Sequence, residues 1–208
     1  MLLLDIGNTF AHLFDGNSVQ KYDVNKIIKE YSDKKLYYIN VNPKVSSVIK
    51  ENPNWIDLSK YVKLDGAYEG MGIDRQVLCL SYNRGIFIDA GSAITIDKVI
   101  DGKFIGGTIL PGLWSLKRCY QDISSKLIID NIKDIDIEKL PNSNTKDSIS
   151  YGIIAPIVFL IERINKENLP LYFSGGDGKI LKKYFKDAIY DELLIFRSMA
   201  NIVRRIRC

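Results

Sequence analysis

An apolar segment that ends in Asp-x-Gly occurs twice in this chain. The first copy is Leu2-Leu-Leu-Asp-Ile-Gly-Asn-Thr-Phe10, and the second is Ile86-Phe-Ile-Asp-Ala-Gly-Ser-Ala-Ile94. Each copy continues with strand-forming residues to an Asp-Gly pair, at Asp15-Gly16 and at Asp101-Gly102, which favours a hairpin turn followed by a return strand. Two copies of one hairpin predict two related lobes.

Helical and strand patterns alternate along the rest of the chain, which predicts the α/β class. In the first lobe we expect a helix over 25–31, a buried strand over 36–41, a helix after Pro43 and a helix over 74–82. In the second lobe we expect a helix from 113 to about 127, a long helix over 145–166 capped by Asn144, a strand over 171–173, an amphipathic helix, a last strand over 193–196 and a terminal helix. The lobes are predicted as residues 1–84 and 85–208.

Composition excludes several classes of protein. With 208 residues, 46% of them hydrophobic, the chain can bury one large core or two small ones without disulfides. The three cysteines contain no C-x-x-C pair, which argues against a zinc site and fits a reducing, cytoplasmic location. A net charge of +4 gives little support to nucleic-acid binding, and the apolar runs are too short for a signal peptide or a membrane span.

The first Asp-x-Gly turn is suited to phosphate. It places the Asp5 carboxylate at the end of a strand, and glycine then allows backbone N–H groups to approach an anion closely. Asp5 could help to hold Mg²⁺ on phosphate oxygens, while Gly7, Asn8 and Thr9 supply donors. The alternative is an ordinary hairpin in which Asp and Asn serve only the turn.

The repeat strengthens the phosphate interpretation. Asp89-Ala-Gly-Ser-Ala would hold the phosphates from the other side, and two such turns suit a triphosphate better than one. The Gly-rich turn at 174–178 follows a strand and precedes a helix, where backbone could pass an adenine or ribose; the alternative is a simple strand-to-helix connection.

Gly72-Ile-Asp-Arg75 places an acid and a guanidinium at the start of a helix, after a Gly-rich loop. Asp74 could accept the proton of an attacking hydroxyl, and Arg75 could hold an acidic substrate. A helix N-terminal acid beside a surface arginine is the alternative. On spacing alone, Asp74 and Asp89 both remain candidates for the base.

These motifs, together with Gly106-Gly, Pro111-Gly112 and Ser174-Gly-Gly-Asp177, resemble type III pantothenate kinase in content and order over nearly the whole chain. The resemblance implies a duplicated ribonuclease-H-like fold of the actin-like ATPase superfamily, with mixed five-stranded sheets in two lobes and assembly as a homodimer. It also implies phosphorylation of pantothenate by ATP with Mg²⁺, the first step of coenzyme A synthesis.

The resemblance also implies roles for individual residues. Asp74 would be the general base, and Asp89 would coordinate a K⁺ or NH₄⁺ ion. The nucleotide would be bound by Asp5, Ile6, Gly7, Asn8, Thr9, Phe10, Ala11, His12 and Ser92. Pantothenate would be bound by Tyr68, Gly72, Ile73, Asp74, Arg75 and Thr145.

Two departures and two alternatives accompany this assignment. The second motif of the family usually reads Asp-x-Gly-Thr, and Ser92 keeps the hydroxyl without the methyl group. The loop before Gly72 is shorter than usual in the family, and the assignment of Tyr68 to the substrate site depends on this loop. The alternatives are another small-metabolite kinase of the actin-like superfamily, and a non-catalytic relative that acts as a transcription accessory factor.

Overall fold

The structure, a computed structural model, describes residues 1–207, with side chains through Ile206; Cys208 lies outside the described residues. The residues form two compact units. Unit 1 contains Met1–Asn83, Val99–Ile105 and the described residues from Glu192 onward, and unit 2 contains Arg84–Lys98 and Gly106–Asp191. The first break lies between Asn83 and Arg84, and two later segments of the chain join unit 1. The predicted division into two lobes, residues 1–84 and 85–208, stays a prediction.

Unit 1 is organised around a five-stranded sheet in the order β3-β2-β1-β4-β5. The central strand β1 pairs antiparallel with β2 and parallel with β4. The strands are β1 (Leu2–Ile6), β2 (Ala11–Phe14), β3 (Val19–Tyr22), β4 (Leu36–Asn40) and β5 (Trp55–Asp57).

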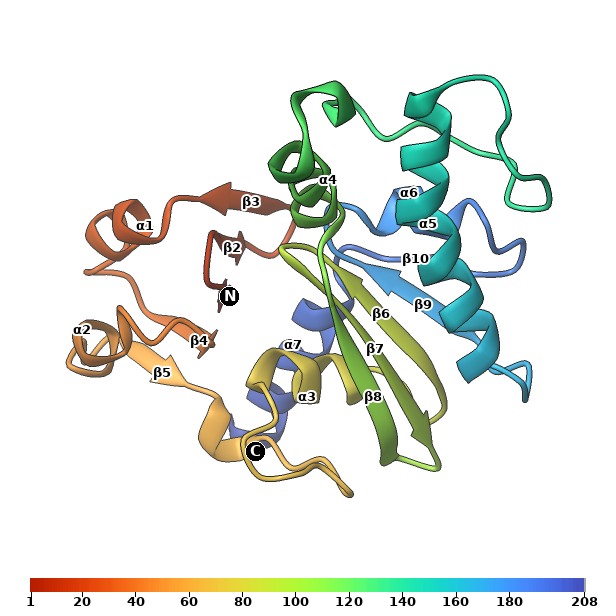
Figure 1. Ribbon diagram of the computed structural model, residues 1–208. Coiled ribbons are helices and arrows are strands. Elements are labelled where there is room, and N and C mark those ends of the chain that lie inside the picture. The colour runs from red at the N-terminus through yellow and green to blue at the C-terminus, as the bar shows by residue number, and fades with distance from the viewer. Residues whose placement is uncertain (208) are drawn as a thin grey trace. The chain divides into compact units, whose positions relative to one another are not determined.

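Both faces of this sheet are covered, which explains the continuous apolar run in β1. Successive side chains of a strand point to opposite faces, so Leu4 packs with α1 and α2, while Leu3 packs with α3 and α7. Helices α3 and α7 lie side by side (Figure 1). The helices are α1 (Val24–Glu30), α2 (Ser46–Lys50), the 3₁₀ helix η1 (Ser59–Tyr61), α3 (Ile73–Cys79) and α7 (Leu194–Arg207).

The second sheet has the order β10-β9-β6-β7-β8. Its strands are β6 (Gly85–Ala90), β7 (Ala93–Ile100), β8 (Lys103–Pro111), β9 (Leu171–Ser174) and β10 (Ile189–Tyr190). Taken in chain order within each sheet, the first strand is central, the second and third lie on one side, and the fourth and fifth lie on the other. Because the two sheets share this order, the predicted duplicated α/β fold is confirmed.

The hairpin between β7 and β8 turns at the predicted Asp-Gly pair. Asp101 and Gly102 both have positive φ, 51° and 76°, as this type of tight turn requires. The remaining helices are α4 (Leu113–Ile123), the 3₁₀ helix η2 (Ser125–Leu127), α5 (Thr145–Ile164) and α6 (Gly178–Lys182). Asn144 caps α5 as predicted, accepting a hydrogen bond from the backbone N–H of Asp147.

One predicted element is wrong. Residues 193–196 were expected to form a strand, but α7 begins at Leu194, and the last strand is the two-residue β10. The apolar run Leu193-Leu-Ile-Phe196 leads into the first turn of α7, whose buried residues continue as Met199, Ile202 and Val203, a helical spacing. Within residues 1–207, no helix combines the length and apolar character that a membrane span needs.

Candidate functional site

The first Asp-x-Gly turn closes tightly at the end of β1. The Gly7 N–H donates to the Phe10 carbonyl at 3.0 Å, and Asp5 is paired with His12 across the two strands. Asp5 is half-buried, whereas Asn8, Thr9 and Phe10 are exposed. The turn therefore presents polar groups to solvent next to a carboxylate at the strand end, as the phosphate interpretation requires.

Asn42, in the loop that follows β4, holds this turn in place, a role that the sequence did not indicate. It is buried, and its Nδ2 donates to the carbonyls of Gly7 at 3.3 Å and Asn8 at 3.4 Å. Its Oδ1 accepts from the Lys44 N–H at 3.0 Å, so the amide is anchored on both sides. The only signal in the sequence was an Asn placed just after a buried strand.

His12 lies on β2 opposite Lys21 of β3. Burial, and then the nearby ammonium of Lys21, lower the pKa of His12 below its usual 6.5. At neutral pH the imidazole is therefore uncharged and can donate or accept a hydrogen bond, but it offers no positive charge to a phosphate.

The second Asp-x-Gly turn closes at the end of β6, where the Gly91 N–H donates to the Ala93 carbonyl at 2.9 Å. Two other glycine-rich motifs of unit 2 pack onto it. The Gly112 N–H donates to the Ser92 carbonyl at 3.1 Å, and a Cβ on Gly112 would collide with the carbonyls of Gly91 and Ser92. The structure thus brings Pro111-Gly112 to the second turn.

The Ser174–Gly178 segment approaches the same turn from β9. The Asp177 N–H donates to the Ala90 carbonyl at 2.9 Å. Gly175 has a φ of +79°, and a Cβ there would stand 2.7 Å from the Asp89 Oδ1 atom as well as collide with the Ala90 carbonyl. Only glycine allows backbone so close to the Asp89 carboxylate, so the three motifs of unit 2 form one cluster.

Asp74 stands at the start of α3 with its carboxylate folded back toward the chain. Its Oδ1 accepts the Arg75 N–H at 2.8 Å, and a Cβ on Gly72 would lie only 2.5 Å from that oxygen. Burial raises the pKa of Asp74 above its usual 3.8, while the Arg75 N–H and guanidinium oppose the shift. A desolvated carboxylate with a raised pKa is a better proton acceptor than a solvated one.

Arg75 is a buried cation rather than a surface arginine. Its side chain is 5% exposed, and Nη1 donates to the Tyr68 hydroxyl at 2.7 Å. The guanidinium also lies 5.9 Å from the centre of the Tyr68 ring. The loop 66–72 therefore carries Tyr68 to the guanidinium of α3, and two of the predicted substrate residues touch each other.

The remaining predicted residues lie in separate elements. Ile73 is the first residue of α3, and Thr145 is the exposed first residue of α5 in unit 2. Asp89 is half-buried and Ser92 is exposed at the second turn. The structure thus brings Tyr68, Gly72, Asp74 and Arg75 together in unit 1, and Asp89 and Ser92 together in unit 2.

Comparisons with known proteins agree on one family. A family model described as type III pantothenate kinase matches residues 38–167. A type III pantothenate kinase of Campylobacter jejuni is 40% identical over 204 residues, covering 98% of this chain and 97% of the relative. One from Helicobacter hepaticus is 36% identical and covers 99% of both chains.

Solved structures agree with the fold. A Campylobacter jejuni protein described as a Baf family transcriptional activator has a TM-score of 0.90 at 39% identity, covering 100% of this chain and 99% of that one. The ethanolamine utilization protein EutJ of Carboxydothermus hydrogenoformans has a TM-score of 0.52 at 11% identity, covering 96% of this chain and 88% of its own, which concerns the fold alone. From the family match and the full-length relatives, this chain belongs to the type III pantothenate kinase family.

Proposed function

We propose that this chain transfers the γ-phosphoryl group of ATP to the hydroxyl of pantothenate and forms 4′-phosphopantothenate, the first step of coenzyme A synthesis. The observation that carries the proposal is the Gly72-Ile-Asp-Arg75 segment in a chain of this family. It holds a desolvated carboxylate next to a buried guanidinium, which are the two groups needed for an acceptor that carries both a hydroxyl and a carboxylate.

In this proposal Asp74 accepts the proton of the attacking hydroxyl. Its raised pKa supports the role, because proton transfer is most effective when the base has a pKa closer to the working pH. Arg75 binds the pantothenate carboxylate, and Tyr68 orients the guanidinium through the 2.7 Å hydrogen bond. Gly72, Ile73 and Thr145 complete the substrate contacts.

ATP is bound by residues 5–12 and by Ser92. Phosphoryl transfer depends on positioning and charge neutralisation more than on covalent help, so no cysteine or serine nucleophile is required. Each Asp-x-Gly turn, taken by itself, offers backbone donors and polar side chains that suit phosphates, and Asn42 keeps the first turn closed.

Mg²⁺ would accompany ATP and neutralise charge on its phosphates. Residues 1–207 contain no cluster of three acidic, histidine or cysteine side chains that could hold a metal by themselves. In proteins Mg²⁺ usually keeps several waters and takes one or two carboxylates together with substrate phosphates. Asp5, half-buried at the end of β1, is the carboxylate that we assign to it.

A K⁺ or NH₄⁺ ion would be coordinated by Asp89. The cradle around this carboxylate supports the assignment, because Gly175 leaves room beside Oδ1 that a Cβ would fill. Backbone carbonyls and a carboxylate oxygen are suitable ligands for such a cation.

We also propose that the protein is a cytoplasmic homodimer. Phe159 of α5 is a large apolar side chain that is exposed, and a second subunit would cover it.

The test is an assay that couples ADP release to a readout, with pantothenate as acceptor and with or without K⁺. Turnover that requires pantothenate and is abolished in Asp74→Asn, with ATP binding retained, is the expected result. Phosphorylation of a sugar but not of pantothenate would assign the chain to another kinase of the superfamily. Absence of turnover with every acceptor and cation would favour a non-catalytic transcription accessory protein.

A further inference from the structure

Residues 128–144, which we call the strap, connect η2 to α5 without helix or strand of their own. The strap is nevertheless fixed at several points in unit 2. Ile129 is buried, the Lys133 N–H donates to the Ser150 hydroxyl at 3.1 Å, and the Ile137 carbonyl accepts from the Tyr151 hydroxyl at 3.2 Å. These three contacts hold the strap against α5 through its backbone and one apolar side chain.

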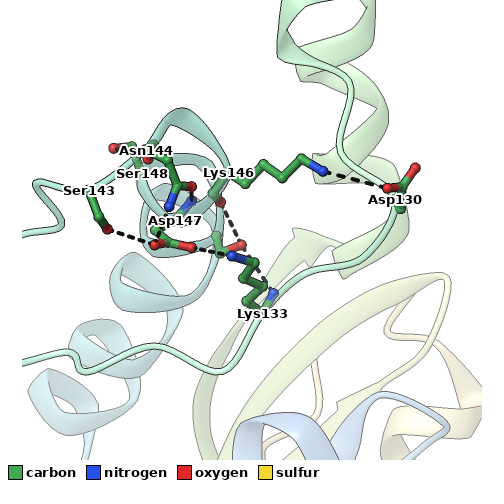
Figure 2. A network of polar contacts seen from close by, with 8 residues as sticks. Asp130, Lys133, Ser143, Asn144, Lys146, Asp147 and Ser148 are labelled. Carbon is green, nitrogen blue, oxygen red and sulfur yellow. Dashed lines mark hydrogen bonds and ion pairs between the residues drawn. The ribbon is translucent and has the colours of Figure 1, made fainter.

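A second set of contacts joins the strap to the first turn of α5 through Asp147 (Figure 2). Asp147 Oδ2 accepts from the Ser143 hydroxyl at 2.8 Å and from Asn144 Nδ2 at 2.7 Å. Asp147 Oδ1 accepts from Lys133 Nζ at 2.8 Å. The Asp147 carboxylate thus gathers three side-chain donors, all from the strap.

The contacts around Asp147 fix the backbone on both sides of Thr145. Asn144 Oδ1 accepts the Asp147 N–H at 3.0 Å while Asn144 Nδ2 donates to the Asp147 carboxylate, so cap and helix hold each other reciprocally. Thr145 lies between these two residues, at the first position of the helix, and is exposed. The backbone at Thr145 is therefore held from both sides by the Asn144–Asp147 pair.

We propose that Lys133 and Asp147 are positioning residues for pantothenate, which act by fixing the first turn of α5 and with it Thr145. The inference rests on the proposed function, in which Thr145 contacts the substrate. Lys133 does not touch Thr145 itself; it acts through the Asp147 carboxylate, which in turn holds the cap.

The Lys133–Asp147 ion pair affects the position of the first turn of α5 more than the stability of the fold. The Lys133 and Asp147 side chains are 50% and 25% exposed, and an exposed ion pair contributes little to the free energy of unfolding. Hydrogen bonding from Lys133, Ser143 and Asn144 lowers the pKa of Asp147, so its carboxylate is charged throughout the neutral range. Loss of Lys133 leaves the strap in place, because its backbone bond to Ser150 does not use the side chain.

The test is Lys133→Met, assayed by ADP release over a range of pantothenate concentrations. We expect the KM for pantothenate to rise roughly two- to fivefold, the range for an exposed ion pair, with kcat and the KM for ATP within twofold of the parent. Lys133→Arg should recover most of the loss. The difference between parent and Lys133→Met should shrink at high salt, because the ion pair is then screened.

Lys183→Met is the matched control. It removes another ion pair of the strap, between Asp134 and Lys183 Nζ at the end of α6, at 2.7 Å, and leaves the printed contacts of Asp147 intact. The KM for pantothenate should stay unchanged in this variant. An equal rise in both variants, or a fall in kcat alone for Lys133→Met, would overturn the inference.

Two further outcomes separate this inference from the proposed function. If the parent protein does not phosphorylate pantothenate, the proposed function fails first, and the inference falls with it. If the parent is active and Thr145→Val raises the KM for pantothenate while Lys133→Met does not, only the positioning role of Lys133 and Asp147 is refuted.

Discussion

Gly72→Ala should disable catalysis without harming the fold. Gly72 has φ −52° and ψ 136°, which alanine adopts without strain, so replacement should leave stability unchanged or raise it by about 0.4–1 kcal/mol. The new Cβ, however, would stand 2.5 Å from the Asp74 Oδ1 atom, whereas ordinary contact begins at 3.4 Å. The carboxylate must therefore move by at least 0.9 Å, the difference 3.4 − 2.5.

The size of the effect follows from that displacement. A misplacement of about 1 Å at a reacting group can lower the rate about 100-fold, equivalent to about 2.7 kcal/mol of activation free energy. Moving Oδ1 also disturbs its 2.8 Å hydrogen bond with the Arg75 N–H. We expect kcat with pantothenate to fall about 100-fold, while the affinity for ATP and the melting temperature stay close to those of the parent.

The measurement combines ADP release, titration with a fluorescent ATP analogue and thermal unfolding. Asp74→Asn is the comparison: if alanine acts only through the carboxylate, Gly72→Ala should lose no more turnover than Asp74→Asn does. A kcat within threefold of the parent would refute the reasoning, as would a fall in melting temperature large enough to explain the lost activity.

Three further predictions concern pH, backbone and substrate affinity. Burial raises the pKa of Asp74, and only the deprotonated form accepts a proton, so kcat/KM should fall with decreasing pH around a midpoint above 3.8; a midpoint at or below that value in the pH–rate profile would contradict the burial. Gly175→Ala places a Cβ at φ +79° against the Ala90 carbonyl and should lower the free energy of unfolding by at least about 1–2 kcal/mol. The melting temperature should then fall by roughly 2–8 °C, and an unchanged melting curve would argue against this packing. Tyr68→Phe removes the 2.7 Å hydrogen bond to Arg75 and should raise the KM for pantothenate about three- to tenfold. This rise is smaller than the loss of a buried charged hydrogen bond would give, because Tyr68 is 51% exposed and water can replace its hydroxyl. An unchanged KM would exclude Tyr68 from orienting the guanidinium.

Local features of the fold could be predicted from the sequence. The two Asp-x-Gly turns, the Asp101-Gly102 hairpin and the Asn144 cap each depend on neighbouring residues, and the structure confirms all of them. The shared strand order of the two sheets follows from the repeat, because equal hairpins and equal helix placement favour equal topology. Patterns of residues close together in the chain were therefore sufficient for most elements.

Features that depend on distant residues could not be predicted. β5 has only three residues, Trp55–Asp57, too few for a periodic pattern. Four apolar residues at 193–196 read equally well as strand or helix, and the decision came from packing against the first sheet.

The site shows the same limit. Asn42 bonds to a turn 35 residues earlier, and the closeness of Gly175 to Asp89 exists only after β9 pairs with β6. Asp74 was a candidate on type and spacing, but the pKa rise that distinguishes it from an ordinary helix acid requires burial, which no local pattern reports.

The packing of α7 has a consequence for synthesis of the protein. Helix α7 packs on the face of the first sheet to which Leu3 points. Its buried residues on that face are Phe196, Met199, Ile202 and Val203, and the Phe196 ring stacks on the Phe14 ring with 5.6 Å between the ring centres. A nascent chain on the ribosome therefore exposes one apolar face of its first strands until residues 194–207 have been synthesised. During that interval the early strands are the segment most exposed to aggregation and most in need of a chaperone.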